Sequence, residues 1–436
     1  MFASSIRRLG FLSLLLAAPL ASGCAAPVDA DEAEEVGSNE DEVTAVPQSV
    51  VERQSIGNCW IYAHASWLES MNKSATGQTY DSSQSYQTYW HWFEQLVNGE
   101  TEGDSEIQTG GWFRTSNYLT ERYGVAPEAA FVPEDVGSEM SARQKAALDK
   151  INLEMKSGRL ATPNARRNRS LVRTVLDEAF ALSPEVRAQM RKVFGATATR
   201  NLTSKSRTTG KFTADTRGTF VVRPSEFAVK YTRWDAAAGK SEVVTGSLDK
   251  AMSEWRSAYY STWNGRATQI RVQRALHDAQ PVVVSWMVDF NALSNSDQPG
   301  APQGSFTKTL LDRNKPGRQG GHMTVFHDYE IKLASGEVLA AGTTLDPANP
   351  EHKAKLDAAL DPRATIIKMR VKNSWGTARD DRGFVRGFGG YHDLYMDYLN
   401  GPIKSCTETD NLKPLAERGC NRDATPLNEV ILPPGY

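Results

Sequence analysis

The stretch Gln54–Ala63 places a thiol at the predicted start of a helix. After Cys59 the apolar residues recur with helical spacing, and the preceding Gly57-Asn58 is typical of a turn in which Asn58 caps the helix. A thiol attacks a carbonyl carbon as its thiolate, yet a free Cys with a pKa near ~8.5 is mostly protonated at neutral pH. A helix N-terminus and a neighbouring His can lower that pKa, so Cys59 is a candidate nucleophile. The side chain of Gln54 carries N–H groups that could hold a developing oxyanion.

A histidine and an asparagine that could assist this thiol lie far along the chain. His322 leads a run, 320–326, that predicts a short strand, and Asn373 ends a second predicted strand within 371–376. Nucleophilic catalysis by a thiol needs a base beside it and a group that orients the base. His327 is the nearest rival, but an odd separation on a strand puts the two His side chains on opposite faces. We therefore expect His322 and Asn373 to join the thiol in one site.

In this order, Gln54, Cys59, His322 and Asn373 resemble the papain-like cysteine peptidases, and the most specific matches are the Cys-Trp pair and the Lys-Asn-Ser-Trp-Gly run. Further segments are closest in style to the bleomycin hydrolase and aminopeptidase C group of that family: 83–90, 109–112, 121–127, 222–227 and 429–433. The resemblance implies an α+β, papain-like two-lobe fold, with a helical lobe, an antiparallel β lobe and here a helical insertion. It implies hydrolysis of peptide bonds through a thiolate acyl-enzyme, with no cofactor and no metal.

The resemblance also implies a role for each residue of the site. His322 would take the proton of Cys59, and Asn373 would accept a hydrogen bond from the other ring nitrogen and so fix the tautomer. Trp375 would shield that hydrogen bond from water. Gln54 and the backbone N–H of Cys59 would hold the oxyanion, although Gln54 lies one position closer to the Cys than is usual in the family.

Two further regions bear on substrate binding. Gly110 and Gly111 match the glycines that let substrate backbone approach closely in papain-like enzymes, with a plain turn as the alternative. The resembled group extends further at its C-terminus and lays a terminal arm in the cleft, which restricts it to aminopeptidase action. Here the sequence ends at Pro433–Tyr436, and three extended residues span at most ~10 Å. We expect a cleft open at both ends, with endopeptidase and aminopeptidase action both left as alternatives.

Residues 1–24 predict export rather than folded structure. Two arginines precede a short apolar run, 11–20, that is too brief to span a membrane, and the residues up to Cys24 resemble a bacterial lipobox. We expect lipidation of Cys24 and anchoring to a membrane of the cell envelope; the alternative is a cleaved signal peptide and a periplasmic or secreted protein. Residues 25–49 are acidic and poor in large apolar residues, which predicts a disordered tether.

The remaining cysteines and the composition narrow the possibilities. Cys406 and Cys420 lie 14 positions apart in a loop-rich region of an exported chain, so we expect a disulfide. Closing a loop of that size stabilises by about 3 kcal/mol in the chain-entropy model. This pairing leaves Cys59 as the unpaired thiol. The composition, 40% hydrophobic and 23% charged, is that of a globular protein, and the formal net charge of −2 argues against a nucleic-acid partner.

The length of 436 residues exceeds one typical domain. The expected segments are a lipoprotein-type signal peptide (1–24), a tether (25–49), a helical lobe with the nucleophile (50–136), a helical insertion (137–218), a β-rich lobe with the His and the Asn (219–403), and a C-terminal tail with the disulfide (404–436). Helices are expected at 142–155, 170–182, 183–194 and 268–277, and a buried strand at 281–288. Five tryptophans are expected in the core: Trp60, Trp67, Trp90, Trp92 and Trp112.

The residues together predict an exported cysteine peptidase that acts on peptides or proteins. A different class of function is also compatible with the sequence, namely a surface protein that keeps the fold for binding and no longer turns over substrate. A third possibility is acyl transfer of the transglutaminase type, which usually has an Asp where Asn373 stands.

Overall fold

The computed structural model describes residues 46–101, 106–205, 208–210, 214–260, 265–407, 413–414 and 417–436. The predicted signal peptide, Cys24 and nearly all of the predicted tether lie outside these residues. Within them, no helix is long and apolar enough to cross a membrane.

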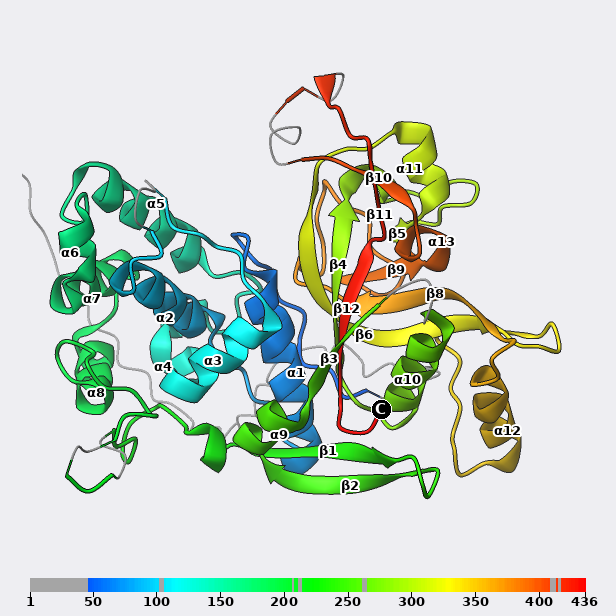
Figure 1. The fold of residues 1–436 in the computed structure, drawn as a ribbon, viewed down its shortest axis with the longest axis horizontal. Coiled ribbons are helices and arrows are strands. Elements are labelled where there is room, and N and C mark those ends of the chain that lie inside the picture. Colours follow the sequence, from blue (N-terminus) through cyan, green and yellow to red (C-terminus); the bar gives the residue numbers. More distant parts are fainter. Residues whose placement is uncertain are drawn as a thin grey trace, which may run out of the picture. The chain divides into compact units, whose positions relative to one another are not determined.

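Helices make up the first half of the described chain (Figure 1). Four precede the predicted insertion: α1 (Cys59–Thr76), α2 (Gln84–Val97), α3 (Phe113–Tyr123) and α4 (Glu128–Phe131). Four more lie within it: α5 (Ala142–Ser157), α6 (Pro163–Arg167), α7 (Arg169–Ala179) and α8 (Pro184–Phe194). The three helices predicted there from periodicity are α5, α7 and α8. Their starts are set by side-chain caps on backbone N–H groups, from Ser141, Asn168 and Ser183.

Aromatic side chains form the core of this helical region. Trp67, Trp90 and Trp92 are buried, and Trp90 stacks on Tyr123 with ring centroids 3.9 Å apart. The prediction was wrong for Trp112, whose side chain is 60% exposed. It precedes the first residue of α3, where the chain is extended, and so does not share the buried face of that helix.

Strands dominate the second half, and the sheet that carries the site is largely antiparallel (Figure 1). In the described residues its strands run in the order β3 (Arg256–Tyr259), β12 (Leu427–Leu432), β4 (Val282–Asp289), β6 (Gln319–Lys332), β8 (Thr365–Lys372), β9 (Tyr391–Tyr395) and β5 (Ser305–Phe306), with β7 (Val338–Leu339) paired to β6. The helices of this region are α9 (Leu248–Glu254), α10 (Gly265–His277), α11 (Lys308–Asn314), α12 (Pro350–Ala359) and α13 (Met396–Leu399). The predicted α+β class, with a helical lobe and a β lobe, is confirmed by these elements.

Pairing of the His and Asn strands survives the long connection between them, as expected. The connection contains β7 and α12, yet β6 and β8 remain antiparallel neighbours, with Val325 opposite Lys372. A longer loop raises the entropy of closure only logarithmically, so the strands still pair.

A second hairpin was not anticipated from the sequence. β1 (Ala228–Asp235) and β2 (Lys240–Ser247) form a separate two-stranded sheet. Val229 and Tyr231 are buried on one face of β1, and Asn72 of α1 donates a 2.8 Å hydrogen bond to the carbonyl of Ala228. The alternation of buried and exposed positions along β1 is the signal that could have predicted it.

The segment 404–436, expected to be a tail, is in part a strand of the main sheet. β12 lies between β3 and β4, with Val430 opposite both Ala258 and Val284. The last residues lie against β1 and α10, where Trp234 N–H donates to the carbonyl of Pro434 and Arg271 donates to the carbonyl of Tyr436.

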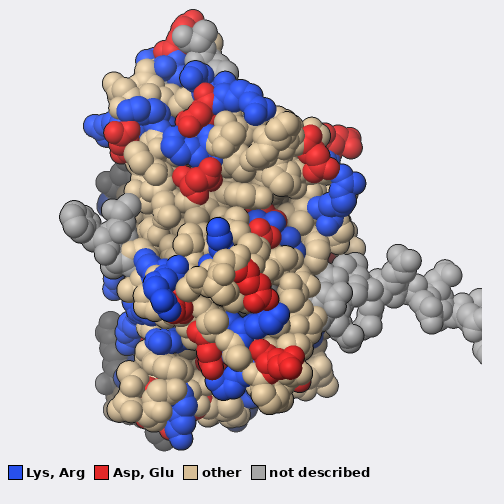
Figure 2. All heavy atoms as spheres, turned by 90° about the vertical axis from the view of Figure 1, so that its right-hand side faces the viewer, with Lys and Arg blue, Asp and Glu red and all other residues tan. Residues whose placement is uncertain are grey.

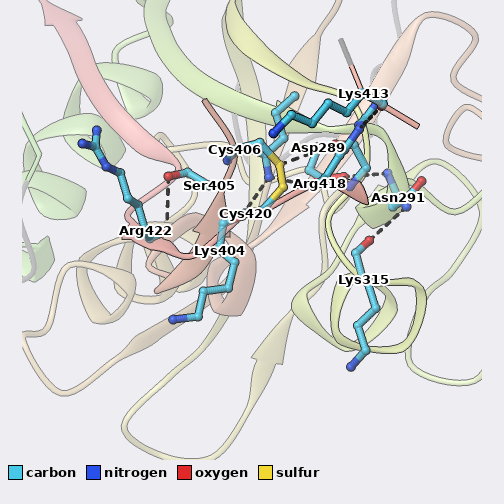
Figure 3. Close-up of a disulfide and its surroundings, with 12 residues drawn as sticks. Asp289, Asn291, Lys315, Lys404, Ser405, Cys406, Lys413, Arg418, Cys420 and Arg422 are labelled. Atoms are coloured by element: carbon cyan, nitrogen blue, oxygen red, sulfur yellow. Dashed lines mark hydrogen bonds between the residues drawn. A yellow bond between two sulfur atoms is a disulfide. The ribbon is translucent and has the colours of Figure 1, made fainter. Parts of the chain in front are cut away.

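The predicted disulfide between Cys406 and Cys420 is present (Figure 3). Its segment also contains the short pair β10 (Ile403–Ser405) and β11 (Arg422–Ala424). The N–H of Cys406 donates a 2.8 Å hydrogen bond to the side chain of Gln319, the first residue of β6. The disulfide-bonded segment is thereby joined to the strand that carries His322.

Charged side chains are distributed in small groups over the face drawn in Figure 2, where acidic and basic residues are interspersed among uncharged ones.

Candidate active site

Cys59 is the first residue of α1, as predicted, and it is buried. Asn58 occupies the N-cap position, but its side chain makes no capping hydrogen bond. Instead its amide donates to Thr88 Oγ1 at 3.0 Å and to Gln144 Oε1 at 2.8 Å. The expected capping role of this side chain was therefore wrong, and Asn58 joins the start of α1 to α2 and α5.

The thiol lies beside the strand that carries the predicted base, because α1 packs against β6 and the backbone of Met323, the residue after His322, interacts with the thiol of Cys59. Burial raises the pKa of the Cys59 thiol to about 11, since a thiolate would lose its hydration. The backbone N–H groups of Met323, Trp60 and Cys59 act in the opposite direction, because each stabilises the thiolate. Two of these three belong to the first turn of α1, where N–H groups lack helical partners.

His322 and Asn373 meet at one end of the sheet. His322 stands near the start of β6 and Asn373 directly follows β8, and antiparallel pairing brings a strand's start beside its neighbour's end. His322 Nε2 lies 2.7 Å from Asn373 Oδ1. An amide oxygen only accepts, so the ring proton is on Nε2 and Nδ1 is left as the basic nitrogen.

Hydrogen bonds to both the oxygen and the nitrogen of the Asn373 side chain fix the orientation of its amide. Its Oδ1 also accepts from the backbone N–H of Ser374 at 2.7 Å, and its Nδ2 lies 3.2 Å from Nδ1 of His392. His392 is fully buried, and burial lowers its pKa to about 3, so it is neutral and can accept this hydrogen bond. His392 was missed in the sequence, where a His inside a strand carries no signal that it contacts a distant Asn.

Trp375 covers the His–Asn hydrogen bond, as the resemblance implied. Its ring stacks on His322 with centroids 4.8 Å apart, and Trp286 meets the same imidazole edge-on at 5.6 Å. Between these indoles His322 is buried, and burial lowers its pKa to about 4. The imidazole is therefore neutral near pH 7.

His327, the rival base, lies elsewhere. Its ring is 4.8 Å from that of Tyr391, and the β6–β8 register shifts between Phe326 and Asp328, at the position of His327 itself. It is His322 that is hydrogen-bonded to Asn373. The odd separation of the two His residues along the strand favoured His322, and it is His322 that lies beside Asn373, although β6 is irregular at His327.

Gln54 lies next to the Asn373 loop. Its side-chain oxygen accepts from Ser374 Oγ at 2.6 Å, and its backbone N–H donates to the Ser374 carbonyl at 2.9 Å. The Gln54 amide nitrogen donates to the carbonyl of Ile56 at 2.7 Å. That nitrogen carries two hydrogens, so one N–H is engaged by Ile56 and a second is available for an oxyanion.

The two glycines expected to contact substrate differ from each other. A Cβ on Gly111 would come within 2.5 Å of the Trp60 indole, whereas a Cβ on Gly110 would have no atom within 4 Å. Trp60 Nε1 also donates to the carbonyl of Thr109 at 3.0 Å, which ties this loop to the first turn of α1. Gly111 is thus required by packing, and Gly110 has open space in front of it.

A buried lysine beside the site was also missed. Lys372 immediately precedes Asn373, and its ammonium donates to Ser49 Oγ at 2.7 Å and to Ser66 Oγ at 3.0 Å. Burial lowers its pKa to about 8, and the carboxylates of Glu69 and Glu52 act against that shift. These contacts join the segment before Gln54, α1 and β8. A single Lys next to the Asn motif gave no sign of this in the sequence.

Among the described residues, no group of three or more His, Cys, Asp or Glu side chains is arranged to hold a metal ion.

No protein-family model and no curated protein sequence matches the chain. Three solved structures to which it is similar share 10–12% sequence identity with it. PepW from Lactobacillus rhamnosis HN001 has 11% identity over 89% of this chain and 81% of that chain, with a TM-score of 0.42. Xylellain, a cysteine protease from Xylella fastidiosa, has 12% identity over 90% and 86%, with a TM-score of 0.35. The cysteine protease and lectin-like domains of Cwp84, a surface layer associated protein of Clostridium difficile, have 10% identity over 88% and 49%, with a TM-score of 0.30. At these values the roles of the residues rest on the geometry described above.

The glycine pair gives a matched test of packing. Gly111→Ala should lower the free energy of unfolding by about 1–3 kcal/mol, because the new methyl group overlaps the Trp60 ring. Gly110→Ala should change it by less than about 0.5 kcal/mol, as expected for a position with open space. Urea unfolding followed by fluorescence measures both. Equal stability of the two variants would contradict the assigned packing of Gly111.

The pH dependence of activity follows from the shift at His322. Its pKa is lowered to about 4, so the base stays neutral well below the ordinary value near ~6.5 and is lost only as the pH falls through about 4. We expect the acid limb of kcat/KM near pH 4. An acid limb near pH 6.5 in a protein that is still folded would contradict this environment.

Acid unfolding must be followed in the same samples. Burial also lowers the pKa of His64, His91 and His277 to about 4. Groups with a lowered folded pKa stabilise the fold fully above their unfolded pKa near ~6.5, and that contribution is lost as the pH falls towards 4. Tryptophan fluorescence at each pH separates the loss of folded protein from protonation of the base.

Proposed function

We propose that this protein is a papain-like cysteine peptidase in which Cys59 is the nucleophile, His322 the general base and acid, and Asn373 the orienting residue. The observation that carries the proposal is the 2.7 Å hydrogen bond from His322 Nε2 to Asn373 Oδ1 beneath Trp375, with the buried thiol of Cys59 packed beside the next residue of the same strand. These are the three parts that thiol catalysis requires: a nucleophile, a base and a group that orients the base.

In this mechanism the Cys59 proton moves to Nδ1 of His322 as the sulfur attacks the carbonyl carbon of a substrate amide. A carbon–sulfur bond forms, and the carbonyl electrons move onto oxygen. The imidazolium then gives its proton to the amide nitrogen as the carbon–nitrogen bond breaks and the amine leaves. Water attacks the thioester, His322 accepts its proton, and the acid product and the free thiol are formed.

Because both groups are buried, loss of the proton by Cys59 and its gain by His322 are expected to occur together. A thiolate alone and an imidazolium alone are each disfavoured at this site, as the pKa values of about 11 for Cys59 and about 4 for His322 express. Transfer of a proton from one to the other leaves the net charge of the site unchanged and creates an attractive pair in a low dielectric. The ion pair therefore forms as a unit, and its two titrations belong to the pair.

The oxyanion would be held by the backbone N–H of Cys59 and by the second N–H of Gln54. Cys59 is the first residue of α1, and Gln54 lies five residues before it, where two hydrogen bonds to Ser374, the residue after Asn373, hold it. Loss of a single donor of this kind typically raises the barrier by ~2.7–4 kcal/mol. Gln54 thus links the oxyanion site to the residue that orients the base.

We further propose that the protein acts outside the cytoplasm. The disulfide between Cys406 and Cys420 is a bond that persists in oxidising compartments. The lipobox-like sequence that ends at Cys24 supports anchoring to a membrane of the cell envelope. Peptides or proteins in that compartment would be the substrates.

The nucleophile is tested with Cys59→Ala, which should reduce peptide hydrolysis to background because no other thiol is free in the described chain. A peptidyl chloromethylketone should label the wild-type protein at Cys59 alone, as peptide mass mapping would show. His322→Ala should be nearly inactive, and His327→Ala serves as its matched control. Robust hydrolysis by Cys59→Ala would refute the mechanism. Absence of labelling and of hydrolysis in the folded wild type would favour the alternative of a non-catalytic binding protein.

The orienting residue is tested with Asn373→Ala, which leaves Nε2–H of His322 buried without its acceptor. A hydrogen bond to a group that becomes charged is worth about 1.5–3 kcal/mol, so kcat should fall roughly tenfold to a hundredfold. KM should change little, because the amide does not contact substrate in this mechanism. Steady-state kinetics decide the point; a variant with raised KM and unchanged kcat would show that Asn373 serves binding instead.

A further inference from the structure

A cavity of about 500 Å³ lies between α2 and α3 on one side and β3 and β12 on the other. Three aromatic side chains at its walls are exposed to unusual extents for their size: Trp112 is 60% exposed, Tyr118 41% and Tyr259 71%. The guanidinium of Arg122 already lies over the Tyr118 ring, 4.8 Å from its centroid, so Trp112 and Tyr259 are the candidates for a ligand. Exposed aromatic rings around one hollow are typical of a ligand site, and they attract cations through their π-electrons.

The charges at this cavity are mainly negative. Its walls carry the carboxylates of Glu94, Glu100 and Glu429 and the guanidinium of Arg114, and Arg122 lies beside the wall, where it pairs with Glu94. The imidazole of His91 also lines it, and burial lowers the pKa of that group to about 4, so it adds no positive charge at neutral pH. A positively charged ligand would be attracted to such a surface.

The three carboxylates are not equivalent. Glu94 is already engaged: it accepts hydrogen bonds from the Tyr123 hydroxyl and from Asn98 Nδ2 (2.7 Å), and it pairs with Arg122 at 3.5 Å. Glu429 is only 8% exposed, and its backbone is paired with β3 and β4, whereas among the described residues its carboxylate has no side-chain hydrogen bond or ion pair. Because Glu429 lines the cavity, its carboxylate can accept a charge-assisted hydrogen bond from a cation that enters there.

Side-chain contacts connect the cavity wall to the start of α1. Trp60, which follows Cys59, meets His91 edge-on with ring centroids 4.7 Å apart, and His91 lines the cavity. The Trp60 ring also packs against Gly111, and the next residue is Trp112 in the cavity wall. A peptide that runs from the open space at Gly110 towards Cys59 would therefore pass this hollow.

We propose that the cavity binds a positively charged group of the substrate, with Glu429 as the counter-charge and Trp112 and Tyr259 as aromatic walls. This inference rests on the proposed peptidase function. The cation is an amine or a guanidinium, which a peptide can supply either as a Lys or Arg side chain or as its free N-terminal ammonium group. Glu429 is a specificity-determining residue in this proposal and takes no part in the proton transfers.

Binding is measured in the Cys59→Ala background, so that it can be read without turnover. The probes are short peptides with a fluorophore at the C-terminus and one Arg moved through successive positions, each with a twin that carries neutral citrulline instead. All are prepared with acetylated and with free N-termini. Fluorescence polarisation should show at least tenfold tighter binding of one Arg peptide, or of the free-amine peptides, than of the matched neutral form.

Glu429→Gln keeps the size of the side chain and removes its charge, and it should reduce that preference to less than about twofold. Glu121→Gln is the matched control, because it removes one charge from an exposed position of α3 that does not line the cavity. Tyr259→Ser and Trp112→Ala change exposed side chains, so they test the aromatic walls without disturbing the core.

The two peptide series distinguish a side-chain cation from an N-terminal one, and comparison with cleavage by the wild-type protein distinguishes failure of the cation site from failure of the peptidase function. Loss of an Arg-over-citrulline preference in Glu429→Gln assigns the cation to a side chain, and loss of a free-amine preference assigns it to the N-terminus. Absence of any preference, or a preference that persists in Glu429→Gln, overturns the proposal. If the wild-type protein cleaves peptides without a charge preference, the peptidase function stands and the cation site fails. If the preference is present but no peptide is cleaved, the cation site stands and the peptidase function fails.

Discussion

The site depends on the antiparallel pairing of β6 with β8. In this register Val325 lies opposite Lys372, so the residues before Val325 face those after Lys372 across the same end of the sheet. His322 consequently meets Asn373 and Trp375, although about fifty residues of chain, including α12, separate them along the sequence. A register slip of one residue would turn His322 to the other face of the sheet and separate it from the thiol. The hydrogen bond between His322 and Asn373 therefore requires that β6 and β8 pair in this register.

Burial is the second constraint, and it acts on the thiol and the imidazole in opposite directions. It raises the pKa of Cys59 and lowers that of His322, so each group alone is held neutral. In the proposed mechanism, the same low dielectric would strengthen the attraction between the two charges once a proton has moved from sulfur to nitrogen. The backbone N–H groups at the start of α1 and at Met323 stabilise the thiolate without any charge of their own. The environment thus disfavours isolated charges and favours a paired one.

The sequence predicted the parts of the site that depend on local pattern. Helical periodicity after Cys59, a strand led by His322 and a strand that ends at Asn373 are each visible in a few consecutive residues, and the structure brings these elements together. Contacts between distant segments could not be predicted in this way. The position of Asn58 was correct, but its side chain bonds to α2 and α5 because partners there outcompete the local cap. Trp112 was misplaced because an aromatic residue at a helix start has no periodicity to assign its face.

The C-terminal strand β12 is the clearest case in which the residues of an element do not predict its neighbours in the sheet. β12 follows a loop-rich, disulfide-bonded segment, and nothing in its six residues states that it inserts between β3 and β4. In a strand alternate side chains face opposite ways, so Glu429 shares a face with Ile431, which packs in the core of the helical region, while Val430 faces the other core. That seating holds a carboxylate against the helical lobe, beside aromatic residues of α3. The same sheet therefore carries the hydrogen-bonded His322 and Asn373 at the ends of β6 and β8 and the carboxylate of Glu429 on β12. In the proposed function, one sheet would position both the base that acts on the peptide bond and a charge that selects among substrates.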